Sequence, residues 1–380
     1  RSLPNLVEFT NKWAKKISHR LKEYPIMTKQ TGLGKLKVIH YQSTNLITPV
    51  VNHFLTADLS GSTCILTKTN DEALQLCGML MKNGLKAKLI QSNEDFSLYN
   101  LAEVRYFLNQ LYSNADTFLI QDELWEFAKR ELAKRFHKSD KLDICLNLIR
   151  DFELSHPKRK YKSDWEVFLR ESKLEDFHRA NHEIILISTI HKVKGKEFDN
   201  VVILLENFRA ETDADKRLLY VAMTRAKQNL TIHLNSKILN GFTAQNLEWI
   251  EDRQVYPPPT QLTKQLSLKD IWLDYFTTRQ YLVSPLVAGE KLTLSEAGCL
   301  NSKGQSVLKF SQKFLREIEE HHAKGYVTSS VKVNFILYWR KEEDGKEYRI
   351  ILPEIQFAKT NKDFESSNHS PAPISDKLSR

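Results

Sequence analysis

Residues 188–198 read STIHKVKGKEF and directly follow the apolar run EIILI at 183–187. An apolar run of this length predicts a buried parallel strand. The carboxyl end of such a strand is the usual ligand position in an open α/β sheet. A plain core strand needs no threonine, histidine or lysine cluster at its end, so the stretch predicts a strand that leads into a binding site.

Five residues of this stretch carry the predicted chemistry. Thr189, His191 and Lys192 can donate hydrogen bonds to phosphates. Gly195 permits a tight turn, and Glu197 can accept a hydrogen bond from a sugar hydroxyl. The alternative is a connection with solvated lysines and one structural glutamate, and this stretch alone does not decide between the two.

A second stretch, KRLLYVAMTRAKQNLTI at 216–232, predicts a helix followed by a strand. Its apolar residues form the buried face of the helix, and Arg225 projects away from that face. An arginine at the end of a packed helix can reach a γ-phosphate and neutralise charge as the phosphoryl group leaves. The alternative is an ordinary surface arginine.

Composition restricts the class of protein. The chain has 380 residues, 41% of them hydrophobic, with a net charge of +9 and a pI of about 9.1. The positive charge suggests a polyanionic partner, although simple solubility explains it equally well. The four cysteines show no CxxC pairing, so we expect no metal site and a reducing, cytoplasmic location. The first residues lack a Met and an apolar leader, and we expect a chain cut from something longer.

The order of the predicted elements indicates an α/β fold. Residues 3–24 have helical spacing, and 62–70 is an apolar strand. A helix capped by Asn70 or Asp71 and a strand at 85–90 follow, which gives a β-α-β pattern typical of a parallel sheet. Strand signals disappear over 101–180, which we interpret as a helical insertion, and they return before residue 188. The α/β domain is expected to end near residue 240.

Two further regions complete the organisation. The stretch 129–162 of the insertion has eleven Lys or Arg against five Asp or Glu. After the stiff YPPPT linker at 256–260 we expect a small domain over 256–360, with helices at 267–279 and 311–323, a strand-like segment at 281–294 and a hairpin turning at Asp344–Gly345. This domain suggests a Tudor- or SH3-like barrel. The polar tail at 361–380 is expected to be disordered.

The two motif stretches together resemble motifs V and VI of superfamily 1 DNA helicases of the UvrD/Rep/PcrA group. The first family pattern is matched by Thr189, His191, Lys194, Gly195, Glu197 and Phe198, and the second by Leu218, Tyr220, Val221, Ala222, Thr224, Arg225 and Ala226. Residues 1–14 resemble the continuation of motif IV, of which Arg1 and Ser2 are present. The segment around Lys68 resembles a family strand whose arginine touches DNA.

The resemblance implies a fold and roles for single residues. Residues 1–100 and 181–240 would form the second RecA-like domain, with 101–180 as its inserted subdomain. Arg1 and Arg225 would contact the γ-phosphate, and Glu197 and Gly195 would belong to the nucleotide site. Lys68, Asn70, Thr189, His191 and Lys192 would contact the DNA backbone. Lys194 favours the branch that moves 3′→5′.

The resemblance also implies ATP and Mg²⁺ as cofactors, DNA as the partner, and a role in DNA repair. The chain contains no G-x-x-x-x-G-K-[ST] motif: TGLGKLK at 31–37 imitates it, but Lys29 stands where the first glycine is required. FLIQDELW at 118–125 imitates a Walker B strand, yet Asp122 is better explained as a helix cap. We therefore expect the P-loop in an upstream RecA-like domain of the same polypeptide, and the fragment alone to be inactive.

Two expectations concern the rest of the chain. The basic insertion, above all Lys158, Arg159 and Lys160, is predicted to form a second DNA contact; a solvated helical face is the alternative. The small C-terminal domain could bind a protein partner through Tyr338, Trp339 and Tyr348. The main competing function is a non-catalytic nucleic-acid-binding or partner-recruiting module that has kept a helicase fold.

Overall fold

The computed structural model describes residues 2–19, 24–57, 60–91, 96–112, 118–178 and 184–360. The predictions for Arg1 and for the tail at 361–380 lie outside the described residues. No helix in the described ranges is long and apolar enough to cross a membrane.

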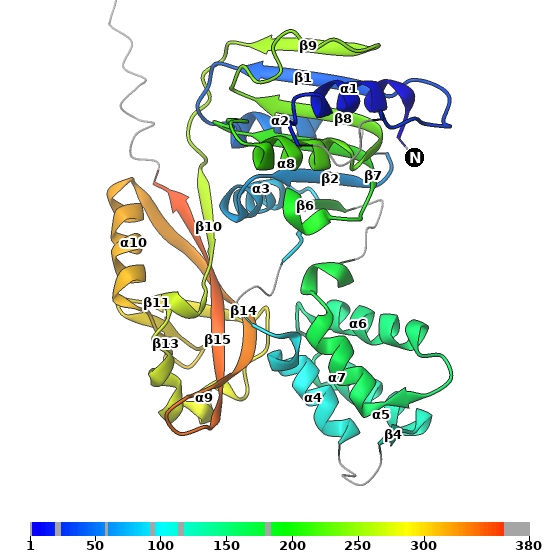
Figure 1. The fold of residues 1–380 in the computed structure, drawn as a ribbon. Coiled ribbons are helices and arrows are strands. Elements are labelled where there is room, and N and C mark those ends of the chain that lie inside the picture. The colour runs from blue at the N-terminus through cyan, green and yellow to red at the C-terminus, as the bar shows by residue number, and fades with distance from the viewer. Residues whose placement is uncertain are drawn as a thin grey trace, which may run out of the picture.

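A seven-stranded parallel sheet forms one unit of the protein, shown at the top of Figure 1. The strand order is β3-β6-β2-β7-β8-β1-β9, and every recorded pairing is parallel. This confirms the predicted α/β class with a parallel sheet. The strands are β1 Lys35–Tyr41, β2 Thr63–Thr67, β3 Ala87–Leu89, β6 Ile185–Thr189, β7 Phe198–Leu205, β8 Ala226–Leu234 and β9 Leu247–Asp252.

Helices cover both faces of this sheet, as burial of both faces of a parallel sheet requires. One face packs against α1 Pro4–Ala14 and α8 Asp213–Met223 through a core that contains Phe9 and Trp13. The other face packs against α2 Ile47–Thr56 and α3 Asn70–Lys82 through a second core that contains Val50 and Leu80.

Two helix boundaries differ from the prediction. Helix α1 ends at Ala14, well before residue 24, and the backbone amides of Ser18 and His19 donate to the Asp213 carboxylate of α8. These bonds hold the chain against α8 in a non-helical course. Helix α3 is capped by Thr69, whose hydroxyl accepts from the Glu72 amide, so neither Asn70 nor Asp71 is the cap.

The parallel sheet also extends further along the chain than predicted. Strand β9, at 247–252, pairs with β1 and forms an edge of the sheet, so the unit continues past residue 240. Helix α2 went unpredicted, although its residues Ile47, Val50, Val51 and Phe54 are buried.

The described part of the insertion contains four α-helices: α4 Ala102–Leu111, α5 Asp122–Arg135, α6 Leu142–Ser155 and α7 Lys162–Glu171. Their core contains Trp125 and Trp165, whose rings lie 5.4 Å apart, with Phe107 and Phe152 packed around them. A two-residue ladder pairs β4 Leu119–Ile120 with β5 Lys160–Tyr161, although no strand was expected there. Helix α5 begins at Asp122, in the segment that imitates a Walker B strand, and its N-cap is Gln121, so Asp122 is the first helical residue and not the cap.

An antiparallel sheet of six strands forms the third unit, with the order β10-β15-β14-β11-β12-β13. The predicted hairpin is confirmed and is longer than expected, and the helix predicted at 311–323 is confirmed as α10 Gln312–Ala323. Residues 267–279 form short 3-10 helices, and the strand-like segment at 281–294 begins inside a helical turn, α9 Gln280–Val283. Closure into a Tudor- or SH3-like barrel stays a prediction. The strands are β10 Gln261–Gln265, β11 Lys291–Ser295, β12 Gly298–Leu300, β13 Ser306–Lys309, β14 Tyr326–Arg340 and β15 Glu347–Lys359.

The insertion and the antiparallel sheet share one hydrophobic core. Buried residues of α4 to α7 and of β14 and β15 belong to a single cluster that includes Phe107, Leu132, Leu337 and Phe357. Leu101 forms an antiparallel bridge with Leu337, and Arg105 forms an ion pair with Glu347. The C-terminal residues therefore contribute to the core of the helical unit, and the predicted division into domains stays a prediction.

We predict that Trp165→Ala lowers the free energy of unfolding by about 3–5 kcal/mol, because the ring is 0% exposed and its loss leaves a cavity. Denaturant unfolding followed by circular dichroism measures this. Phe127→Ala is the matched control: its side chain is 44% exposed on the same unit, and we expect a change within about 0.5 kcal/mol. Equal losses in the two variants would contradict the proposed role of Trp165 in the core.

Candidate nucleotide and nucleic-acid site

The carboxyl ends of β2 and β6 lie side by side on the rim of the parallel sheet where its strands end. We call the residues at these two strand ends the β2–β6 edge. Thr67 and Thr189 are register partners, and both are buried. Lys68 and Asn70 follow the first strand, and His191 and Lys192 follow the second. The fold therefore brings residues from two distant segments of the sequence to the same edge, as expected for parallel neighbours.

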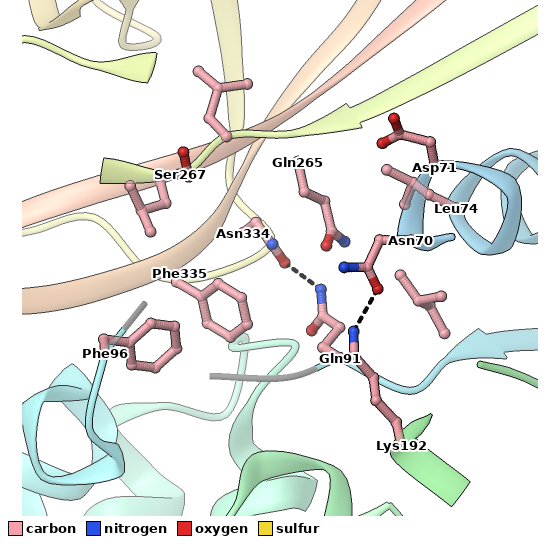
Figure 2. A pocket seen from close by; sticks show the side chains of 13 residues that line it. Asn70, Asp71, Leu74, Gln91, Phe96, Lys192, Gln265, Ser267, Asn334 and Phe335 are labelled. Atoms are coloured by element: carbon pink, nitrogen blue, oxygen red, sulfur yellow. Dashed lines mark hydrogen bonds between the residues drawn. The ribbon is translucent and has the colours of Figure 1, made fainter. Parts of the chain in front are cut away.

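A side-chain hydrogen bond links the segments that follow β2 and β6. Lys192 lies in the 3-10 helix Ile190–Val193, and its Nζ donates to Asn70 Oδ1 over 2.6 Å. Figure 2 shows this bond beside a cavity. Lys68 is exposed and lies over the buried ring of Phe208, with Nζ 5.5 Å from the ring centroid. The side chain of His191 is exposed. The edge thus presents two lysines, a histidine and an amide.

Arg225 occupies a different corner, between the end of α8 and the start of β7. Its Nε donates to Val221 O at 3.0 Å, Nη1 to Lys196 O at 3.2 Å and Nη2 to Thr224 Oγ1 at 3.1 Å. Burial lowers the pKa of Arg225, and the Glu197 carboxylate acts in the opposite direction. The guanidinium is thus held in one orientation within electrostatic reach of Glu197.

Gly195 forms the turn between the two clusters. Its φ is +85°, in the left-handed region that glycine adopts at little cost. A Cβ added at this position would meet no atom within 4 Å. The glycine is therefore required by backbone conformation rather than by close packing, and it sets the direction in which Glu197 leaves the turn.

The start of the described chain lies close to Arg225. Ser2 Oγ donates to Ala226 O over 2.6 Å, and the Leu3 amide donates to Lys227 O over 3.0 Å. Arg1 itself is outside the described residues, so its predicted role stays a prediction.

The predicted basic surface of the insertion lies away from both clusters. Residues 158–160 lead into β5, which pairs with β4 at the far end of the helical unit (Figure 1). Lys158 and Arg159 are exposed, whereas the Lys160 side chain is only 12% exposed and pairs with Asp122 at 2.7 Å. Two of these three cations therefore face solvent, and the third contributes to the packing of α5.

Sequence reasoning missed several polar residues that line the cavity in Figure 2. Gln91 follows β3, whereas Gln265, Ser267 and Asn334 belong to the antiparallel-sheet unit. No local motif marks these residues, because they meet the β2–β6 edge only through the tertiary fold. The described residues contain no group of three or more His, Cys, Asp or Glu that could hold a metal ion.

Comparisons with known proteins identify relatives. Residues 110–237 match the family model described as the UvrD-like helicase C-terminal domain. The chain is 32% identical over 115 residues to the putative ATP-dependent DNA helicase YjcD of Bacillus subtilis, covering 26% of this chain and 15% of that protein. It is 24% identical over 145 residues to the Gabija protein GajB of Bacillus cereus, covering 38% of this chain and 28% of that one.

A solved structure is also similar, the C-terminal domain of a possible DNA helicase from Lactobacillus plantarum. The identity is 16% and the TM-score 0.32, with 66% of this chain and 97% of that chain covered. The family match and the identity to YjcD confirm the predicted resemblance to the C-terminal half of a UvrD-like superfamily 1 helicase. The matches span 15% and 28% of the two curated relatives.

We predict that Gly195→Ala lowers the free energy of unfolding by about 1–2 kcal/mol, because the left-handed backbone strains any residue with a Cβ. Thermal or denaturant unfolding measures the loss. Gly195→Asn is the control, since asparagine tolerates this conformation better, and it should lose less. An alanine variant as stable as the parent would show that the turn can relax to another conformation.

Proposed function

Because residues 110–237 carry a UvrD-like helicase C-terminal domain, we propose that this chain is the C-terminal portion of an ATP-dependent DNA helicase. Such a protein would couple ATP hydrolysis to movement along single-stranded DNA and to unwinding of the duplex. The observation that carries the proposal is the Lys192–Asn70 bond, which unites the ends of β6 and β2 in one polar edge. A nucleic-acid strand following that edge would meet the exposed Lys68 and His191 as well, whereas the predicted contact with Thr189 would need this buried residue to become accessible.

The surroundings of Arg225 support the proposal that the protein binds and hydrolyses ATP. Arginine has five N–H donors, and the hydrogen bonds of Arg225 within the described chain use three of them. The remaining donors can reach a phosphate without rearrangement of the side chain, because the guanidinium is already fixed. Glu197 would bind the ribose of the same nucleotide, as the family resemblance implies, and Gly195 would belong to the same site.

ATP and Mg²⁺ would be held mainly by a P-loop domain, since this sequence contains no P-loop motif. In the proposal that domain belongs to the same polypeptide and faces Arg225. Movement in the 3′→5′ direction rests on the resemblance at Lys194. Lys158 and Arg159 would form a second, more distant contact with DNA, with Lys160 contributing less because of its pairing with Asp122.

A second candidate function follows from the fold, because a fold does not by itself imply an activity. A module with this fold could bind nucleic acid or recruit a partner without hydrolysing ATP. The polar edge at β2 and β6 would then bind DNA as before, and the Arg225 corner would have no catalytic role. Experiments on Lys68 and Arg225 separate the two functions, because they concern different clusters.

We predict that Lys68→Ala weakens single-stranded DNA binding and reduces the salt dependence of binding. One lost phosphate contact lowers the slope of log affinity against log salt by about 0.7 for a single strand. Fluorescence anisotropy at several salt concentrations measures both quantities. Lys15→Ala, which removes an exposed lysine next to α1, is the control and should keep the parent slope. An unchanged slope for Lys68→Ala would remove this residue from the DNA interface.

We predict that Arg225→Ala abolishes most ATP turnover when this chain is joined to its P-loop domain. Loss of an arginine that neutralises the transferring phosphoryl group costs on the order of 10³-fold in kcat at related sites. DNA-stimulated phosphate release measures turnover, and anisotropy checks that DNA affinity stays near the parent value.

Arg209→Ala is the matched control for this experiment, because the Arg209 side chain is 83% exposed and lies beyond β7. Turnover close to the parent rate in Arg225→Ala would contradict the catalytic role proposed for Arg225, whereas a parent without DNA-stimulated turnover would favour the non-catalytic function. A parallel loss of DNA affinity in Arg225→Ala, with normal turnover, would assign Arg225 to DNA rather than to ATP.

A further inference from the structure

A cavity of about 150 Å³ lies where the parallel sheet meets the antiparallel sheet (Figure 2). Asn70 and Lys192 approach it from the β2–β6 edge. Gln265, Ser267 and Asn334 approach it from the antiparallel sheet. It adjoins a larger cavity of about 470 Å³ that shares Gln91, Gln265 and Asn334 as lining residues. The β2–β6 edge, which we propose binds DNA, therefore lies opposite a second surface. Residues of the antiparallel-sheet unit form that surface.

The lining of the smaller cavity carries little charge. Lys192 and Asp71 are its only ionisable residues among those described, and they carry opposite charges. The remaining polar groups are four side-chain amides and one serine hydroxyl, and apolar residues such as Phe335 and Leu74 form the rest. Such a lining does not favour a phosphate group, which needs an excess of cations. It favours a flat, neutral, partly apolar group whose edge carries hydrogen-bond donors and acceptors.

The orientation of two of these amides is fixed by a buried lysine. Lys141 Nζ lies 2.6 Å from Gln91 Oε1 and 2.9 Å from Asn334 Oδ1. Because an ammonium only donates, both contacting amide atoms must be oxygens, which settles the orientation of each amide. Gln91 Nε2 donates to the same Asn334 Oδ1 over 2.8 Å. The NH₂ group of Asn334 is left as a donor with no hydrogen bond inside the described chain.

Gln265 supplies the complementary group. Its Nε2 donates to Glu354 Oε2 over 2.9 Å, and Glu354 also forms an ion pair with Lys332 at 3.5 Å. A carboxylate only accepts, so the nitrogen of Gln265 must face Glu354 and Oε1 must face away from it. The cavity lining thus combines an N–H donor from Asn334 with a C=O acceptor from Gln265, both held in place by further hydrogen bonds.

We propose that this cavity binds one nucleobase of the DNA strand, with Asn334 and Gln265 contacting the base edge. Bases present adjacent donors and acceptors, and side-chain amides are matched to such edges, most clearly to adenine. Lys192 and Asn70 at the mouth of the cavity would contact the backbone of the same nucleotide. This inference rests on the proposed DNA edge, and it assigns to the antiparallel sheet a part in selecting the base.

The test compares the binding of dA, dC and dT homopolymers of equal length to the 380-residue chain by anisotropy. We expect the parent to prefer one homopolymer by on the order of tenfold. Asn334→Asp keeps the oxygen that Lys141 and Gln91 contact but replaces the donor with an acceptor, so it should remove or change this preference. Gln265→Leu removes the acceptor and should also reduce the preference. Both variants should keep the parent salt slope, because neither loses a phosphate contact.

Gln305→Leu is the matched control, because Gln305 belongs to the same unit, is exposed and lines neither cavity. It should retain the parent preference, and thermal unfolding confirms that every variant is folded. A parent that binds all three homopolymers equally, or folded variants that keep its preference, would overturn the proposal. Binding of free deoxynucleoside monophosphates that depends on Gln265, without any effect on strands, would assign the cavity to a mononucleotide and overturn the strand assignment. A parent that binds no DNA at all would instead contradict the proposed helicase function.

Discussion

The pairing of β6 between β3 and β2 is the constraint on which the rest of the structure depends. All five residues of Ile185–Thr189 are buried, and the strand hydrogen-bonds to a neighbour on each side. The helical insertion separates β6 from both neighbours in the sequence. The chain must therefore leave the sheet after β3, build the insertion and return to a fixed register. Because Thr189 pairs with Thr67, that register also determines which polar residues meet at the strand ends.

Local patterns were sufficient to nominate candidate residues and to predict the elements that carry them where a few consecutive residues define both. The segment from Thr189 to Glu197 was identified because a buried strand leads directly into polar residues and a glycine turn. Arg225 was identified because the helix before it has a clear apolar face. The hairpin at Asp344–Gly345 was found because its turn chemistry and strand alternation agree. In each case the physical cause of the structure lies within about ten residues.

The features that escaped prediction depend on distant partners. Strand β9 has little apolar character and forms because the free edge of β1 accepts it. Thr69 caps α3 in place of Asn70 because Glu72 completes a reciprocal capping box with it. Asn334 becomes part of the site only because the antiparallel sheet packs against the β2–β6 edge. At the junction, burial lowers the pKa of Lys141 to about 8, with Lys332 acting in the same direction. That shift reflects a fold in which three units enclose a single ammonium.

The core shared by the insertion and the antiparallel sheet has a consequence for synthesis of the chain. A ribosome delivers the helices of residues 102–171 long before it delivers β14 and β15, whose residues Leu337 and Phe357 belong to the same core. During that interval the nascent helices expose apolar surface, a state that is prone to aggregation and that chaperones commonly protect. A premature stop at the proline linker near residue 257 would make the exposure permanent. Such a product would retain every strand of the parallel sheet, yet cellular quality control should remove it.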